Sequence, residues 1–129
     1  MTRPILNCMA PFFIVKDVKA AVAFYRDKLG FEVLYQGPSE DDIFYAGLVR
    51  GGAMLMVKAV GIEPLPNCKR HPWARWDAYL NTPDPDALAE EFLGRGVEFS
   101  EPLKDTEDGL RGFELKDVDG YVLFFGRPR

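Results

Sequence analysis

The stretch that decides the fold is DVKAAVAFYRDKLGFEV, residues 17–33. Asp17 stands where a helix N-cap belongs, because its carboxylate can accept from the free N–H groups of the first turn. The apolar residues that follow recur at helical spacing: Val18, Ala21, Val22, Phe24, Tyr25 and Leu29. Gly30 predicts the end of the helix, because a left-handed C′ residue costs glycine least. Residues 31–33 then alternate as a strand does.

Working outward, the neighbouring segments complete a repeated unit. Residues 8–15 are apolar and predict a strand before the helix, and residues 32–36, 43–49 and 53–59 predict three strands after it. The last two strands are joined by Arg50-Gly51-Gly52, a hairpin turn by its glycines. Residues 37–42 are polar and predict a loop. The first half is therefore expected to be β-α-β-β-β.

Residues 61–72 contain three prolines and no periodicity, and we interpret them as a linker. Beyond it the same order returns: a strand at 75–81, a helix from Asp84 and Pro85 to Gly96, and strands at 97–99, 110–115 and 121–125. Gly96 repeats Gly30 in this scheme. The other matched pairs are Tyr25 with Phe92 and Gly52 with Gly120. We therefore expect an α+β fold of two βαβββ modules (about 5–60 and 73–127) in one domain spanning 1–129.

Composition narrows the classes of partner and compartment. The chain has 129 residues and a net charge of −4, without a basic stripe, so a nucleic acid or an anionic membrane is not expected as a partner. No stretch has the length or apolarity of a membrane span or a signal peptide. Cys8 and Cys68 are too few for a disulfide scaffold, and reduced thiols are expected. A cytoplasmic protein is the resulting expectation.

The run FIVKDVKAAVAFYRDKLGFEV, residues 13–33, resembles the opening signature of the vicinal oxygen chelate superfamily. That superfamily includes glyoxalase I, bleomycin resistance proteins, fosfomycin-modifying enzymes and extradiol dioxygenases. The closing segment, residues 109–128, is similar to the bleomycin resistance branch. The resemblance implies two modules with curved sheets around a groove that holds the ligand, often completed by a second chain. It does not by itself fix the chemistry, since one fold hosts several functions.

Enzymes of the resembled superfamily hold a divalent metal with His, Glu or Gln side chains. The equivalent positions here are Ala10, Met56, Asp77 and Phe124. Only Asp77 could ligate a hard or borderline metal, and one carboxylate is not the usual set of three protein ligands. No residue adjacent to the other three positions supplies a ligand. We therefore expect no metal and no cofactor.

Strand alternation predicts which side chains share the groove with those positions. The predicted ligand-binding residues are Phe12, Met54, Met56, Asp77, Tyr79 and Phe124. Val122 points the same way, and the alternate residues are expected to form the core against the helices. This apolar and aromatic set, with one carboxylate and one phenol, is typical of a small-molecule pocket. The alternative is that these side chains only pack on one another or on a partner chain.

Other polar and aromatic residues leave alternatives open. His71, the only histidine, could be a general base or a solvated loop residue. Asp77 could anchor a ligand or pair with Arg75 or Arg111. By alternation Trp76 should face the helices, whereas Trp73 could reach the mouth of the groove. The acidic loop 105–108 could attract a cationic ligand or simply be solvated.

The function expected from the resemblance is a metal-free, homodimeric protein that binds and sequesters a small aromatic or cationic molecule, as in antibiotic resistance. No catalytic residue is predicted. The first rival is a divalent-metal-dependent lyase or dioxygenase with atypical ligands. The second rival is a structural or partner-binding dimer with a collapsed groove.

Overall fold

The computed structural model of the protein describes residues 2–129, which form two modules with the same order of elements. The first module comprises β1 (Phe12–Ile14), α1 (Val18–Ala23), the π-helical turn η1 (Phe24–Lys28), β2 (Glu32–Ser39), β3 (Asp42–Arg50) and β4 (Ala53–Lys58). The second comprises β5 (Ala78–Asn81), α3 (Pro85–Gly94), β6 (Glu101–Asp105), β7 (Leu110–Lys116) and β8 (Val122–Pro128). A short helix, α2 (Asn67–Arg70), lies in the connection between them.

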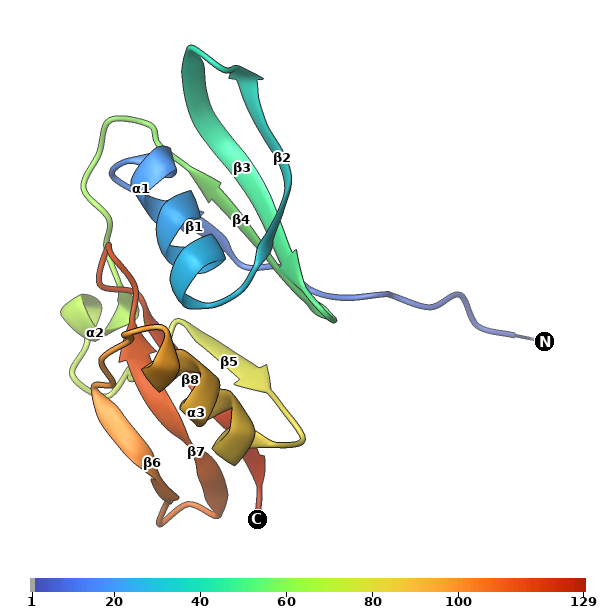
Figure 1. Ribbon diagram of the computed structural model, residues 1–129, viewed down its shortest axis with the longest axis vertical. Coiled ribbons are helices and arrows are strands. Elements are labelled where there is room, and N and C mark those ends of the chain that lie inside the picture. The colour runs from blue at the N-terminus through green and yellow to red at the C-terminus, as the bar shows by residue number, and fades with distance from the viewer. Residues whose placement is uncertain (1) are drawn as a thin grey trace.

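Each module forms one four-stranded sheet, with strand orders β1-β4-β3-β2 and β5-β8-β7-β6. The first strand of each module pairs parallel with the last, and the remaining pairs are antiparallel. In Figure 1 each sheet has one long helix packed on one of its faces: α1 on the first sheet and α3 on the second. Within residues 2–129 no helix covers the opposite face of either sheet, and we call these two surfaces the open faces. The predicted α+β fold of two βαβββ modules is confirmed.

The helices begin and end where their capping residues predict. The Asp17 carboxylate accepts from the Lys19 N–H at 3.0 Å, and Asp84 accepts from the Ala87 N–H at 3.0 Å. Gly30 and Gly96 close the two helical segments with φ of 71° and 82°. Side chains other than glycine rarely adopt this left-handed conformation, which explains the glycine at both equivalent positions.

The core lies between each sheet and its helix, and its residues follow the predicted alternation. The core cluster includes Phe13, Val15, Leu55, Val57, Leu123 and Phe125. Tyr25 and Phe92, equivalent in the repeat, are both fully buried. A strand that is apolar along its whole length is expected to be buried on both faces. Residues 122–126 of β8 are all buried, as this pattern predicts.

Several expected boundaries were wrong. The strand predicted at 8–15 is only Phe12–Ile14, and the loop predicted at 37–42 is largely strand, with β2 reaching Ser39 and β3 starting at Asp42. The strand predicted at 97–99 is absent within the described chain: the backbone first pairs with β7 at Ser100 and Glu101, where β6 begins, and Phe99 packs its ring on Phe113. The linker at 61–72 contains α2, which lacks any apolar periodicity to reveal it.

Buried contacts join the two modules. The Tyr25 hydroxyl of the first module donates to the Asp117 carboxylate of the second at 2.5 Å. Tyr121 donates to the Ile14 carbonyl at 2.5 Å, and its ring stacks on Phe13 at 4.2 Å between centroids. The first hydrogen bond is buried and the second is partly buried, and together with the ring stack they hold the two modules against each other.

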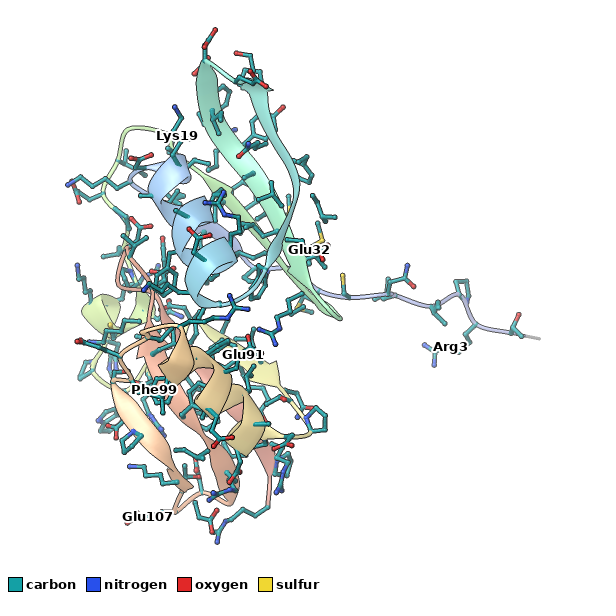
Figure 2. The ribbon with its side chains drawn as sticks, in the orientation of Figure 1. Arg3, Lys19, Glu32, Glu91, Phe99 and Glu107 are labelled. Carbon is teal, nitrogen blue, oxygen red and sulfur yellow. The ribbon has the colours of Figure 1, made fainter. Side chains whose placement is uncertain are left out.

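The N-terminal arm, residues 2–10, extends away from both modules (Figure 1, and Arg3 in Figure 2). Its apolar side chains Ile5, Leu6 and Met9 are 82%, 97% and 91% exposed. Within residues 2–129, none of the helices has both the length and the apolarity needed to cross a bilayer.

Candidate functional site

The open face of the first sheet carries three of the predicted ligand-binding residues. Phe12 on β1 and Met56 on β4 are partners in the strand register, and Met54 lies two residues before Met56 on the same face. Phe12 is 55% exposed and both methionines are partly buried. The result is an apolar patch that no other element of the described chain covers.

The open face of the second sheet carries an aromatic stack. Tyr79 on β5 and Phe124 on β8 are register partners, with ring centroids 5.7 Å apart and nearly parallel. The Phe124 ring lies flat over the backbone of Gly112 and Gly126, where a Cβ at either position would approach its ring carbons to 2.6 Å. Glycine is therefore required beneath this ring, since any side chain would displace it.

Trp76 belongs to the same stack, contrary to the expectation that it faces the helices. Its ring lies 4.4 Å from Phe124 at an angle of 22°, and 5.7 Å from Tyr79. Trp76 leaves only 3% of Phe124 exposed. The expectation failed because β5 begins at Ala78, so strand alternation does not extend back to residue 76. The indole N–H is buried without a hydrogen-bond partner in residues 2–129, so stacking alone holds the ring.

Asp77 is held by backbone groups. Its two carboxylate oxygens accept from the N–H groups of Asn67 and Val122, each at 2.8 Å. The alternative pairing with Arg75 or Arg111 is wrong, since those guanidiniums bind Asp108 and the pair Asp86 and Asp105. Asp77 therefore anchors α2 and β8 to the end of β5.

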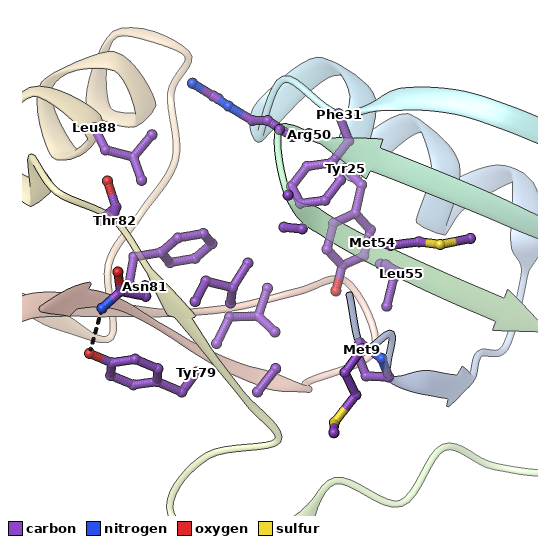
Figure 3. A pocket seen from close by; sticks show the side chains of 18 of the residues that line it. Met9, Tyr25, Phe31, Arg50, Met54, Leu55, Tyr79, Asn81, Thr82 and Leu88 are labelled. Atoms are coloured by element: carbon purple, nitrogen blue, oxygen red, sulfur yellow. Dashed lines mark hydrogen bonds between the residues drawn. The ribbon is translucent and has the colours of Figure 1, made fainter. Parts of the chain in front are cut away.

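A cavity of about 550 Å³ lies between the two modules (Figure 3). Its wall includes Met54 and Tyr79 from the two open faces, together with core rings such as Tyr25 and Phe92. The polar groups at its rim include Arg50, Asn81 and Thr82. A largely apolar cavity of this size with a few polar groups is typical of a small-molecule site. Phe12, Met56, Asp77 and Phe124 are not among its lining residues.

The rim of the cavity is closed by an ion pair that joins the modules. Arg50 donates to both Glu91 oxygens, at 2.7 and 2.8 Å, and to the Leu29 carbonyl at 2.8 Å. Glu91 lies at the junction of the modules in Figure 2. Its hydrogen bonds from Arg50 hold the pKa of the Glu91 carboxyl below its ordinary range. Glu91 also accepts from the Arg95 Nε–H at 3.1 Å, so one carboxylate is shared by two guanidiniums and the cluster of three side chains carries a net positive charge.

A second polar group lies deeper, beside Tyr25. Burial raises the pKa of the Asp117 carboxyl to about 6, although it accepts from the Tyr25 hydroxyl and from the N–H groups of Asp119 and Tyr121. Burial also raises the pKa of Tyr25. Because Asp117 accepts three hydrogen bonds, one of them from the other module, it helps to hold the two modules together.

The residues present do not fit a divalent metal. Ala10 and Phe124 have no donor atoms, and both oxygens of Asp77 already accept backbone N–H groups. Across residues 2–129 no cluster of three or more His, Cys, Asp or Glu side chains could hold an ion. His71 lies exposed, with Nδ1 accepting from the Trp73 N–H at 3.2 Å. This agrees with the solvated reading of His71.

Sequence reasoning missed the residues that depend on the junction of the modules. Arg50 was interpreted only as part of a turn, and Tyr25 and Phe31 only as helix and strand residues, yet all three line the cavity. The signal available for Arg50 was its place before two glycines at a hairpin end. Nothing local indicated that α3 would lie opposite it.

Comparison with known proteins places the chain in a family. Residues 6–125 match the model of the Glyoxalase/Bleomycin resistance protein/Dioxygenase superfamily. No curated protein matches the chain. Among solved structures, the chain is similar to the bleomycin-binding protein of bleomycin-producing Streptomyces verticillus, complexed with copper(II)-bleomycin, at 26% identity and a TM-score of 0.69, covering 100% of both chains.

Two further solved structures show the same fold at lower identity. TnmS3, an antibiotic binding protein from Streptomyces sp. CB03234, is 22% identical with a TM-score of 0.69, covering 99% of this chain and 100% of that one. TioX from Micromonospora sp. ML1 is 24% identical with a TM-score of 0.75, covering 95% and 98%. With nearly the whole sequence matched and every predicted module present, this chain belongs to the glyoxalase/bleomycin resistance protein/dioxygenase superfamily.

Proposed function

We propose that this protein binds and sequesters a small organic molecule without transforming it. The observation that carries the proposal is the cavity of about 550 Å³ between the two modules, which is lined mainly by core side chains and has Met54 and Tyr79 in its wall. Sequestration requires affinity alone, and apolar walls with a few polar groups supply it. The poor fit of the residues to a metal supports binding over the metal-dependent lyase or dioxygenase.

The ligand class follows from the side chains of the open faces. Aromatic rings and methionines favour an aromatic molecule, because flat rings stack and thioethers adapt their shape. Of the proteins named above, one is a bleomycin-binding protein and one is an antibiotic binding protein, which supports an antibiotic as the ligand and resistance as the role. Met54 and Tyr79 would contact a ligand in the cavity, and Phe12 and Met56 would contact a part of it that extends over the first open face. Phe124 would support the site from beneath Trp76, and Asp77 would hold the end of β5 in place.

We further propose that the protein acts as a homodimer in the cytoplasm. The open faces and the arm together present apolar side chains that a single chain leaves in water, including Phe12, Ile5 and Leu6. Large apolar side chains exposed on the arm and on the first open face would be removed from water if a second copy of the chain covered them. Cys8 and Cys68 are both free and exposed thiols, which suits a reducing compartment.

The test is a thermal-shift screen of bleomycin and of other antibiotics that carry aromatic or cationic groups, followed by calorimetry on the hits. A ligand that binds only the folded state raises the melting temperature as its concentration passes its dissociation constant. We expect Tyr79→Ala and Met54→Ala to weaken binding about tenfold or more, since each removes a wall of the site. Leu93→Ala, on the exposed outer side of α3, is the matched control and should leave affinity unchanged.

Two results would count against the proposal. One is a near-stoichiometric divalent metal in protein purified without added metal, with a melting temperature that rises on metal titration. The other is a set of hits whose affinity is equally unaffected by Tyr79→Ala, Met54→Ala and Leu93→Ala, since the ligand would then lie elsewhere.

A further inference from the structure

The aromatic stack of the second open face has a cation on its outer side. Phe124 lies on the two glycines, Trp76 lies on Phe124, and the Arg75 guanidinium lies over the Trp76 ring, 5.0 Å from its centroid. Arg75 also faces the Asp108 carboxylate at 3.7 Å. The order outward from the sheet is thus phenyl ring, indole, planar cation, with a carboxylate beside the cation.

Arg75 is held loosely in this place. Its side chain is 55% exposed, and its one ion pair within residues 2–129, to Asp108, is long and also half exposed. Such pairs contribute little to stability, because water screens them and two long side chains must be ordered. The indole beneath makes no hydrogen bond within the described residues that would fix its position. Arg75 can therefore leave the ring at small cost.

We propose that the outer face of Trp76 is a subsite for a planar, delocalised cation of the ligand, which takes the place of the Arg75 guanidinium and faces Asp108. This rests on the function proposed above and names the ligand class more closely. The indole is the best cation–π surface among the aromatic side chains, and a flat cation can both stack on it and meet a carboxylate at its edge. The internal Arg75–Trp76–Asp108 contact shows that the geometry accepts such a group.

Several ligand groups meet this description, including guanidinium, amidinium and protonated aminoheteroaromatic rings. A compact ammonium does not, because it lacks the flat face that stacks. Tyr79, which contacts the same stack and lines the cavity, connects the subsite to the rest of the proposed groove. A ligand with an aromatic body in the cavity could thus place a cationic ring or tail on Trp76.

The test uses a protein with Trp76 as its only tryptophan, made by Trp73→Phe at a position 85% exposed. The probes are 9-aminoacridine, a planar cation near neutral pH, and acridine, the neutral molecule with the same rings. Quenching of Trp76 fluorescence reports that a probe is bound near this ring, calorimetry gives its affinity, and the dependence of that affinity on Arg75 and Asp108 locates it. We expect 9-aminoacridine to quench Trp76 and to bind more tightly than acridine.

Variants in this background separate the contributions. Arg75→Ala removes the internal competitor and should tighten 9-aminoacridine binding about two- to fivefold. Arg70→Ala, which removes an exposed charge elsewhere, is the control. Asp108→Asn added to Arg75→Ala should weaken 9-aminoacridine about two- to fivefold and leave acridine unchanged, whereas Asp41→Asn, in the exposed turn between β2 and β3, should affect neither probe.

The subsite would be refuted if 9-aminoacridine failed to quench Trp76, or if Arg75→Ala weakened its binding or left it unchanged. The antibiotic screen keeps this outcome distinct from failure of the proposed function. Hits whose affinity depends on Tyr79 and Met54 but not on Arg75 or Asp108 would retain the binding function and overturn the subsite. A protein that binds no screened molecule and neither probe would overturn both.

Discussion

Asp117 is a buried carboxyl on the second module whose hydrogen bond to Tyr25 crosses the junction of the modules. Burial raises its pKa to about 6 from an ordinary value of 3.8, against the opposing effect of three hydrogen bonds. The pKa is therefore higher in the folded protein than in the unfolded chain, and protonation favours folding. This stabilisation is complete below about pH 4 and is lost as the pH rises through about 6.

The free energy of unfolding should therefore decrease as the pH rises from about 4 to about 7. Relative to Asp117→Asn, the natural protein is expected to lose about 1–3 kcal/mol of stability between about pH 4 and pH 7, the scale set by a shift of about two pKa units. Urea denaturation of both proteins over that range measures the difference, and Asp41→Asn is the exposed control. A difference between natural protein and Asp117→Asn that does not change with pH would show that Asp117 titrates normally.

At the scale of the element, the pair β7–β8 shows how one strand serves both the core and the open face. Phe125 points to the helix side and is a core residue, whereas Phe124 points to the open face. Directly opposite each other in the register, Gly112 and Gly126 provide the flat floor on which the Phe124 ring lies. The strand pair thus builds the base of the aromatic stack.

Adding a methyl group to this floor should disrupt it. In Gly112→Ala the new Cβ would lie 2.3 Å from the Phe125 carbonyl and 2.6 Å from the Phe124 ring, so both backbone and ring must move. We expect a loss of about 1–3 kcal/mol in the free energy of unfolding, the usual cost of overpacking, and weaker 9-aminoacridine binding. Gly52→Ala, with nothing within 4 Å, is the control and should be near neutral. Equal stability of the two variants would contradict the packing described here.

At the scale of the whole molecule, both open faces and the N-terminal arm present apolar side chains to solvent. The arm leaves the body beside β1, whose outer edge carries no strand partner in the described chain. An extended segment with exposed Ile5, Leu6 and Met9 is suited to pack on a second copy of the chain. We therefore expect the arm to contribute to the proposed homodimer.

Removing residues 2–10 should weaken that dimer. Burying even one large apolar side chain is worth about 1.5–3 kcal/mol, so the dimer dissociation constant should rise about tenfold or more. Sedimentation velocity over a concentration series measures it, and serine at positions 5, 6 and 9 should have the same effect at full length. Arg3→Ala is the control. A full-length protein that stays monomeric at high concentration would refute the proposed dimer.

The sequence by itself determined the repeated order of elements and the separation of core from open face. Both are local properties: a cap such as Asp17, a left-handed glycine such as Gly30, and side chains that alternate along a strand. Alternation, together with the positions of Met56 and Phe124 that the family resemblance implied, also predicted that Phe12 and Tyr79 lie on the open faces; the pairing of Phe12 with Met56 and of Tyr79 with Phe124 in the register was seen only in the structure.

Only the tertiary structure decided the cavity and the cation on the stack. The cavity depends on α3 lying opposite Arg50 and on Tyr25 reaching Asp117, contacts that span 41 and 92 residues. Trp76 and Arg75 precede β5, where no periodicity fixes a side-chain direction. The same strands and helices could pack together in many ways, and only the contacts between the two modules decide which packing forms. Such long-range contacts cannot be deduced from segments taken one at a time.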